Sequence, residues 1–271
     1  MTSSLYSLNL SSHSLLYHYL PLSPFLSSIS PSMKILGIEK VVRKSEVTDY
    51  SKNPHSLSFQ PYQDNGGTTI GIAGPDFAVI ASDTRLTSGG YDILSRNVPK
   101  VFQLSEKSVL GSCGCWCDVL TFVRVMESKM KNYSYTHGKD LGTPALAQLI
   151  SNSLYQRRFL PYYIHNVLAG LDENGQGCIY TYDPVGCIEK VTMSCSGASM
   201  ELIQPILDNI IDKKNMTNAT KKDLTIDESV NLIHDCFVSA TERQISTGDG
   251  IIFKIITKDG IETKSVGLRR D

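Results

Sequence analysis

The order of apolar segments constrains this chain more than any other feature of its sequence. From residue 68 onward, short strand-like runs come in blocks, and two longer segments with helical spacing of apolar residues follow each of the first two blocks. Single helices alternating with strands would indicate βαβ units, whereas separate blocks indicate sheets packed against helix layers. The sequence therefore predicts an α+β fold with four layers, in which two pairs of helices enclose two sheets.

Clusters of turn residues separate the predicted strands. Thr68–Ala73 and Phe77–Ala81 flank the turn sequence Gly74–Asp76, which predicts a hairpin, and Val101–Leu104 with Val109–Gly111 predicts a second one. Further strands are expected later in the chain, the last two as a hairpin. They are Tyr162–Leu171, Gly177–Tyr182, Cys187–Met193, Ile251–Ile256 and Ile261–Val266.

Four segments have the apolar spacing of amphipathic helices. The first is expected to begin after Asp118 as its N-cap, and the second at Thr143, where Pro144 occupies a first-turn position that favours proline. The third and fourth are expected near Ser199–Ile211 and Asp227–Arg243.

The first 58 residues show no sustained period, which predicts a disordered N-terminal extension or propeptide, residues 1–58, before one domain at residues 59–271. Ser and Pro interrupt every Leu cluster before Met33, so neither a secretory signal nor a membrane span is expected. A net charge of −1 argues against nucleic acid or a membrane surface as partner.

Seven cysteines, an odd number without the spacing of a disulfide framework, favour a reducing compartment. Cys113, Cys115 and Cys117 alternate as at a strand end, which competes with a metal site. Zinc requires four ligands, usually in separated pairs, and no second Cys or His pair is present in the sequence. We therefore expect no metal and no cofactor.

Short motifs at the predicted element boundaries are more specific. Together they resemble the proteasome β-subunit family of N-terminal nucleophile hydrolases, over Phe59–Asp271, and this resemblance implies a four-layer αββα sandwich. Several longer stretches are most similar to a non-catalytic branch of that family. The motifs are Gly66–Thr69, Ser82–Arg85, Pro99–Val101, Ser196–Ser199 and Ser246–Asp249, and the longer stretches are Arg157–Tyr163, Ala169–Glu173, Tyr182–Gly186 and Leu268–Asp271.

Active members of this family are threonine proteases. A Gly–Thr bond breaks, the freed threonine hydroxyl is the nucleophile, and its own amine is the base. The resemblance places the supporting aspartate at Asp83, the lysine at Lys100, the oxyanion-loop glycine at Gly114 and the later serine at Ser196. Each of these side chains also has a structural interpretation as a turn cap, a strand residue or a helix-start residue.

Three departures indicate a degenerate site. The family places its nucleophile sixteen residues before the aspartate, which falls on Gly67, whereas Thr68 lies fifteen before Asp83 and a shift of one reverses a strand side chain. Gln244 stands where the family has an aspartate that orders the threonine amine. Trp116 follows the oxyanion loop, where active members have small residues, and is expected to fill the substrate pocket.

The resemblance thus implies a non-catalytic structural subunit, in contact with neighbouring β subunits, the α ring and the opposite β ring, in cytoplasm and nucleus. Two alternatives stay open. One is an active threonine endopeptidase with Thr68 as nucleophile. The other is an unrelated amidohydrolase of the same superfamily, or a simple two-ring protease.

Overall fold

The structure is a computed structural model that describes residues 61–89, 91–213, 216–217 and 223–270. The predicted extension, residues 1–58, lies outside the described residues, so the domain boundary at residue 59 stays a prediction. The described part of the chain folds around two five-stranded sheets, and every strand pair in them is antiparallel.

The first sheet has the order β10-β1-β2-β11-β12 and the second the order β5-β6-β7-β8-β9, with a small β3-β4 hairpin beside them. The strands are β1 (Thr68–Ala73), β2 (Ala78–Asp83), β3 (Leu86–Ser88), β4 (Asp92–Ser95), β5 (Val101–Ser105), β6 (Ser108–Gly114), β7 (Ile164–Leu171), β8 (Gly177–Tyr182), β9 (Ile188–Val191), β10 (Met193–Gly197), β11 (Gly250–Thr257) and β12 (Gly260–Gly267).

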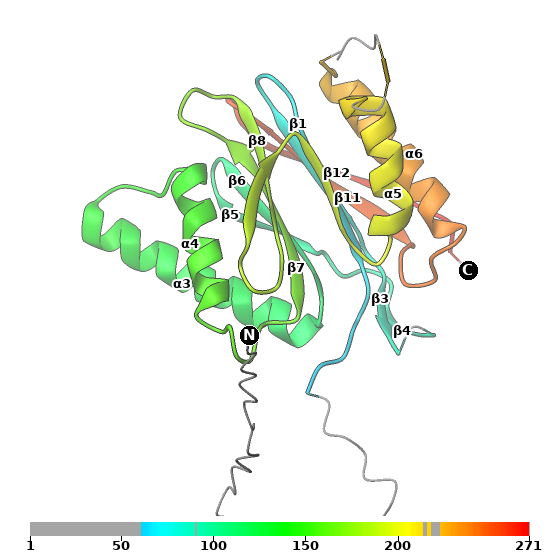
Figure 1. Cartoon of the computed structure of the whole chain (residues 1–271), viewed down its shortest axis with the longest axis horizontal. Coiled ribbons are helices and arrows are strands. Elements are labelled where there is room, and N and C mark those ends of the chain that lie inside the picture. The colour runs from blue at the N-terminus through cyan, green and yellow to red at the C-terminus, as the bar shows by residue number, and fades with distance from the viewer. Residues whose placement is uncertain (1–60, 90, 214–215, 218–222, 271) are drawn as a thin grey trace, which may run out of the picture. The chain divides into compact units, whose positions relative to one another are not determined.

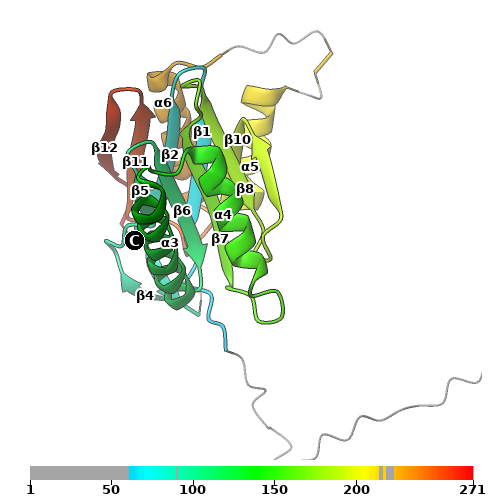
Figure 2. The ribbon, with the colours of Figure 1, turned by 90° about the vertical axis from the view of Figure 1, so that its left-hand side faces the viewer.

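Helices cover the outer face of each sheet. Figure 1 shows α3 (Trp116–His137) and α4 (Thr143–Tyr155) on one side of the two sheets, and α5 (Met200–Leu207) and α6 (Ile226–Thr241) on the other. The turned view in Figure 2 places α3 and α4 in front of the second sheet. Within the described residues, none of the helices has the length and apolar character needed to cross a membrane.

Three clusters of buried apolar side chains fill the spaces between the layers. On β2, Val79 packs toward α5 and α6, whereas Ile80 packs between the sheets. On β6, Val109 lies between the sheets and Leu110 packs against α3 and α4. Successive side chains of a strand point to opposite faces, so both faces of each sheet are buried. This arrangement confirms the predicted α+β, four-layer fold.

The predicted strand Cys187–Met193 is wrong in its extent. The structure has two strands there: β9 pairs with β8 in the second sheet, and β10 pairs with β1 in the first. The chain changes sheets at Thr192, whose carbonyl accepts a hydrogen bond from the Ala73 N–H at 2.8 Å. Neither Gly nor Pro marks this position, so the local sequence gives no turn signal.

The predicted start of the first helix is also wrong. Helix α3 begins at Trp116, and its N-cap, Cys115, makes no side-chain cap hydrogen bond. The carboxylate of Asp118 instead accepts a hydrogen bond from the Tyr163 N–H at 3.0 Å. The short β3-β4 hairpin was not predicted, because its strands are brief and only partly buried.

Candidate functional site

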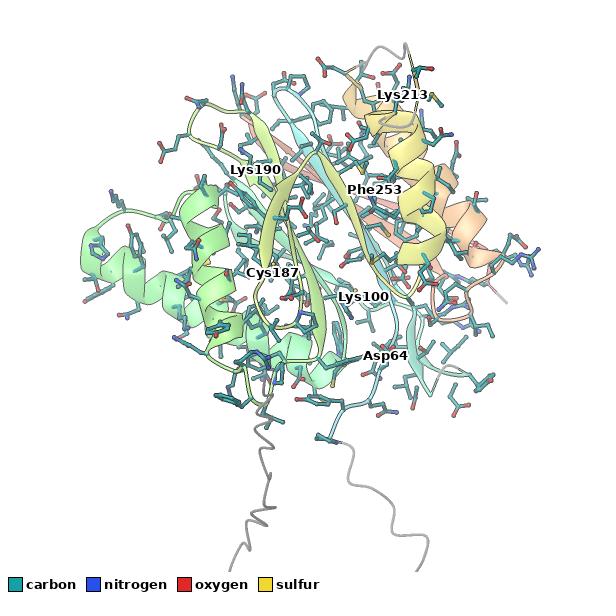
Figure 3. The ribbon with its side chains drawn as sticks, viewed as in Figure 1. Asp64, Lys100, Cys187, Lys190, Lys213 and Phe253 are labelled. Carbon is teal, nitrogen blue, oxygen red and sulfur yellow. The ribbon has the colours of Figure 1, made fainter. Side chains whose placement is uncertain are left out.

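The residues assigned by the resemblance gather at one end of the two sheets, where β1 begins, β2 ends and the loop after α6 returns. Figure 3 labels Lys100 and Asp64 toward this end of the molecule. Lys100 has no exposed surface, and neither has Asp83. The site is therefore built from buried polar groups that need partners inside the protein.

Lys100 and Asp83 form a buried ion pair. The Lys100 Nζ lies 3.1 Å from Asp83 Oδ1 and also donates to the carbonyls of Asp83 and Arg85, at 3.2 and 2.6 Å. Burial raises the pKa of the Asp83 carboxyl, while the Lys100 charge and hydrogen bonds from the Thr68 and Gly248 N–H groups oppose the rise. All the donors of the ammonium are engaged by chain groups.

Residue 67 is the position that faces Lys100. A Cβ added to Gly67 would lie 2.5 Å from Lys100 Cε and 2.7 Å from Cδ. The φ angle of Gly67 is +90°, a value that favours glycine. The Lys100 side chain therefore faces residue 67, which carries no hydroxyl or thiol.

Thr68 lies in a different environment. Its backbone N–H donates to Asp83 Oδ1 at 2.8 Å. Its hydroxyl lies 2.9 Å from the Thr247 hydroxyl and accepts a hydrogen bond from the Ser199 N–H at 3.1 Å, and the hydroxyls of Ser199 and Thr247 are 2.8 Å apart. This buried hydroxyl cluster ties the start of β1 to the start of α5 and to the loop after α6.

The sequence interpretation missed Ser199 and Thr247 as partners of Thr68. Both lie within the motifs that carried the resemblance, three residues after Ser196 and one after Ser246, so the signal was present but was assigned to the neighbouring serines. Ser196 lies in β10, buried and paired with Thr69.

Gly114 ends β6 with both backbone groups engaged. Its N–H donates to the Gly66 carbonyl at 3.3 Å, and its carbonyl accepts from the Asn65 N–H at 3.1 Å. The φ angle of Gly114 is +112°, and an added Cβ would lie 2.7 Å from the Tyr163 carbonyl oxygen. The N–H that the resemblance assigns to an oxyanion already has the chain's own carbonyl as acceptor.

Gln244 stays on its own loop, where its side-chain amide donates to the Ser246 hydroxyl at 2.8 Å. The Trp116 ring lies 6.3 Å from the Phe102 ring, centroid to centroid, and packs against the helix-side core. Its expected role in filling a substrate pocket stays a prediction.

The three alternating cysteines do not share one environment. Cys113 lies at the end of β6 and is buried, Cys115 is the buried N-cap of α3, and Cys117 is exposed on the helix. Burial raises the pKa of the Cys113 thiol to about 12, which disfavours the thiolate. Among the described residues, no group of three or more metal-ligating side chains comes together.

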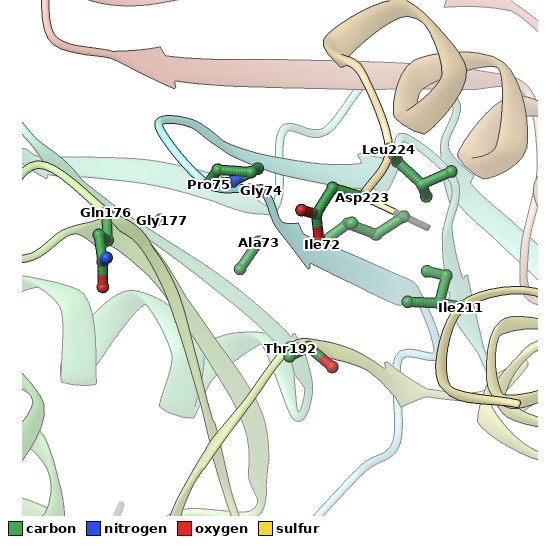
Figure 4. Close-up of a pocket in the computed structure, with 10 residues that line it drawn as sticks. All are labelled: Ile72, Ala73, Gly74, Pro75, Gln176, Gly177, Thr192, Ile211, Asp223 and Leu224. Atoms are coloured by element: carbon green, nitrogen blue, oxygen red, sulfur yellow. The ribbon is translucent and has the colours of Figure 1, made fainter. Parts of the chain in front are cut away.

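A cavity of about 270 Å³ lies at the opposite end of β1 (Figure 4). Ile72 and Gly74 line it from the β1-β2 hairpin, and Thr192 and Ile211 line it from the other side. Asp223 is the single ionisable group among the described lining residues. One carboxyl without a cation or a base partner gives no catalytic arrangement, so the candidate site stays at the Lys100 end.

Comparison with known proteins finds relatives over most of the chain. The family model described as "Proteasome subunit" matches residues 63–256. Proteasome subunit beta type-1 of Drosophila melanogaster is 49% identical over 215 residues, which cover 79% of this chain and 91% of the relative.

Two further relatives are similar to this chain over nearly their whole length. Proteasome subunit beta type-1 of Arabidopsis thaliana is 44% identical over 79% of this chain and 97% of its own length. Proteasome subunit beta type-6 of Saccharomyces cerevisiae is 42% identical over 83% and 96%. The family match spans the strands and loops that bring Asp83, Lys100 and Gly114 together, and by sequence as by fold the chain belongs to the proteasome subunit family.

Proposed function

We propose that this chain is a non-catalytic, structural β subunit of the 20S proteasome core, which completes a β ring and thereby the chamber in which other subunits cut proteins. The observation that carries the proposal is Gly67, which faces the Lys100 side chain and has no nucleophile to offer. Family membership and relatives named as beta subunits support assembly with other proteasome subunits.

Three further features support the absence of catalysis. The Thr68 hydroxyl is engaged by Thr247 and Ser199. The Gly114 N–H bonds the Gly66 carbonyl, and Gln244 carries no charge where the family pattern has an aspartate. The candidate hydroxyl and the candidate oxyanion donor are thus both engaged by the chain itself, and the charged partner is replaced by an amide.

The proposal extends to partners and place. The chain contacts its two ring neighbours, the α ring and the opposite β ring, and it acts in cytoplasm and nucleus as part of the particle. Cross-linking of purified particles, followed by mass spectrometry, tests these contacts one by one.

The decisive experiment takes the intact mass and N-terminal sequence of the chain from native particles, together with a Thr68→Val variant. We expect an N-terminus upstream of Gly67 and unchanged peptidase activities in particles that carry the variant. A terminus at Thr68, with one activity lost in the variant, would instead make the chain an active threonine endopeptidase.

A further inference from the structure

The backbone just before β1 is hydrogen-bonded on both sides. We call residues Tyr62–Gly67 the strap. On one side, the Asn65 N–H donates to the Gly114 carbonyl at 3.1 Å and Gly114 donates back to Gly66. On the other side, the Thr87 N–H donates to the Asn65 carbonyl at 3.2 Å. Gly114 and Thr87 thus flank the strap and hold its backbone from both sides.

The Asn65 side chain is the centre of this arrangement. Only 6% of Asn65 is exposed. Its Oδ1 accepts a hydrogen bond from the Trp116 N–H at 2.9 Å, and its Nδ2 donates to the Thr87 carbonyl at 2.9 Å. Helix α3 has an N-cap, Cys115, without a side-chain cap bond. Asn65, 51 positions before Trp116 in the chain, supplies an acceptor for the N–H of the first helical residue, one of the N–H groups that have no partner within the helix.

The rest of the strap is fixed at two more points. At its outer end, the Tyr62 hydroxyl donates to the Pro161 carbonyl at 2.6 Å, and the Tyr62 ring lies 5.6 Å from the Tyr163 ring. Within the strap, the Gly66 N–H donates to the Asp64 carboxylate at 2.9 Å, which fixes the turn just before β1. The strap therefore has a defined path past Asn65.

We propose that Asn65 is a positioning residue that holds the strap between Gly114 and Thr87, so that the chain itself occupies the backbone hydrogen-bonding groups of these two residues. The inference rests on the proposed function in one respect, since a chain cleaved after Gly67 would lose the strap. The bound segment is the strap itself, an extended backbone that carries the Asn65 carboxamide. This carboxamide accepts from the first N–H of α3 and donates to the Thr87 carbonyl.

The test uses intact particles that contain the full chain as Asn65→Ala, and it measures hydrogen exchange with single-residue resolution. We expect the amides of Trp116, Thr87 and Gly114 to exchange at least about tenfold faster than in the wild type, because their acceptors are lost or loosened. Gln63→Ala is the control, since it removes an exposed amide two residues away that donates to the Ser88 hydroxyl, and its exchange at Trp116 and Gly114 should equal that of the wild type.

Asn65→Asp separates the two side-chain contacts. The carboxylate keeps an acceptor for the Trp116 N–H at a helix N-terminus but loses the donor to the Thr87 carbonyl. We therefore expect the Trp116 amide to stay protected while the Thr87 amide exchanges faster. If Asn65→Ala does not enter particles, Asn65→Asp carries the test by itself.

Wild-type exchange at Trp116 and Thr87 in both variants would overturn the inference and leave the proposed function intact. If the wild-type chain fails to enter particles, or begins at Thr68 in them, the proposed function fails instead. Added protease gives a second readout: cleavage within Tyr62–Gly67 should be faster in Asn65→Ala particles than in wild-type or Gln63→Ala particles.

Discussion

Two buried carboxylates lie on either side of the loop that follows α6, and they are stabilised in different ways. Asp83 pairs with one ammonium, Lys100, which also serves two backbone carbonyls. Asp249 accepts hydrogen bonds from Arg85 Nε at 2.8 Å and from Arg96 Nη1 at 2.6 Å. The loop joins them, since the Gly248 N–H donates to Asp83 at 3.4 Å.

The two carboxyls differ in their pKa values for this reason. Burial pushes the pKa of Asp249 upward, but the hydrogen bonds and charges of Arg85 and Arg96 outweigh it and leave the pKa lowered. At Asp83 burial is the stronger effect, and one ammonium leaves the pKa raised. Two guanidiniums compensate a buried carboxylate better than one shared ammonium does.

The comparison teaches that a lysine and an aspartate typical of an active centre do not by themselves indicate catalysis. Removal of one partner from a buried ion pair leaves an uncompensated charge, so the pair is needed for the fold whether or not a nucleophile stands beside it. Asp249 has no catalytic role in the resemblance, yet two arginines pair with its carboxylate, whereas one lysine pairs with that of Asp83.

The largest effect is expected for Lys100→Met. It leaves Asp83 buried without its cation, which should lower the free energy of unfolding by about 3–5 kcal/mol. Urea unfolding of the purified chain measures this. The double variant Lys100→Met with Asp83→Asn should recover much of the loss, and a double variant no more stable than Lys100→Met would contradict the charge explanation.

Arg85→Met is expected to cost less, about 1–3 kcal/mol, because Arg96 still neutralises Asp249. The same unfolding measurement applies. A loss of stability equal to or greater than that of Lys100→Met would contradict this explanation, since it would mean that the remaining Arg96 guanidinium does not neutralise the buried Asp249 carboxylate.

Thr68→Val should lower stability by about 1 kcal/mol, through loss of the hydrogen bonds to Thr247 and Ser199. Ser82→Ala is the control from the adjacent strand, since the buried Ser82 hydroxyl has no hydrogen-bond partner among the described residues. Its removal should change stability less than Thr68→Val does, and the reverse order would count against a structural role for Thr68.

The smallest effects concern the pH dependence of stability. A carboxyl with a lowered folded pKa stabilises above its ordinary pKa of 3.8 and loses this contribution as pH falls through the folded value. Asp249→Asn should therefore make the loss of stability in acid shallower. Asp83, with a raised pKa, acts in the opposite sense, because its contribution declines as pH rises from 3.8 through the raised value.

The double variant Lys100→Met with Asp83→Asn, which lacks this contribution, should accordingly lose stability in acid more steeply than the wild type. Thermal unfolding between pH 3 and pH 6 compares the slopes. Equal slopes for the Asp249→Asn chain and the wild type would contradict the lowered pKa of Asp249, on which the difference between the two carboxyls rests.

Local patterns in the sequence were sufficient for most elements, and the family resemblance supplied the register at the site. The β1-β2 turn, Pro144 at the start of α4 and the alternating strands each leave a signal within a few residues. These elements follow from side-chain period and turn chemistry, which act over short distances. The interval between Gly67 and Asp83 had meaning only through the resemblance, and residue 67 is the one that meets Lys100.

Only the tertiary structure decided the features that depend on distant partners. The change of sheets at Thr192 depends on β1 being available to pair with β10. The start of α3 depends on Asn65, and the Thr68 hydroxyl finds its partners 131 and 179 positions away, in Ser199 and Thr247. Backbone and hydroxyl groups are nearly alike along a sequence, and burial, which only the folded chain creates, determines which of them must be paired.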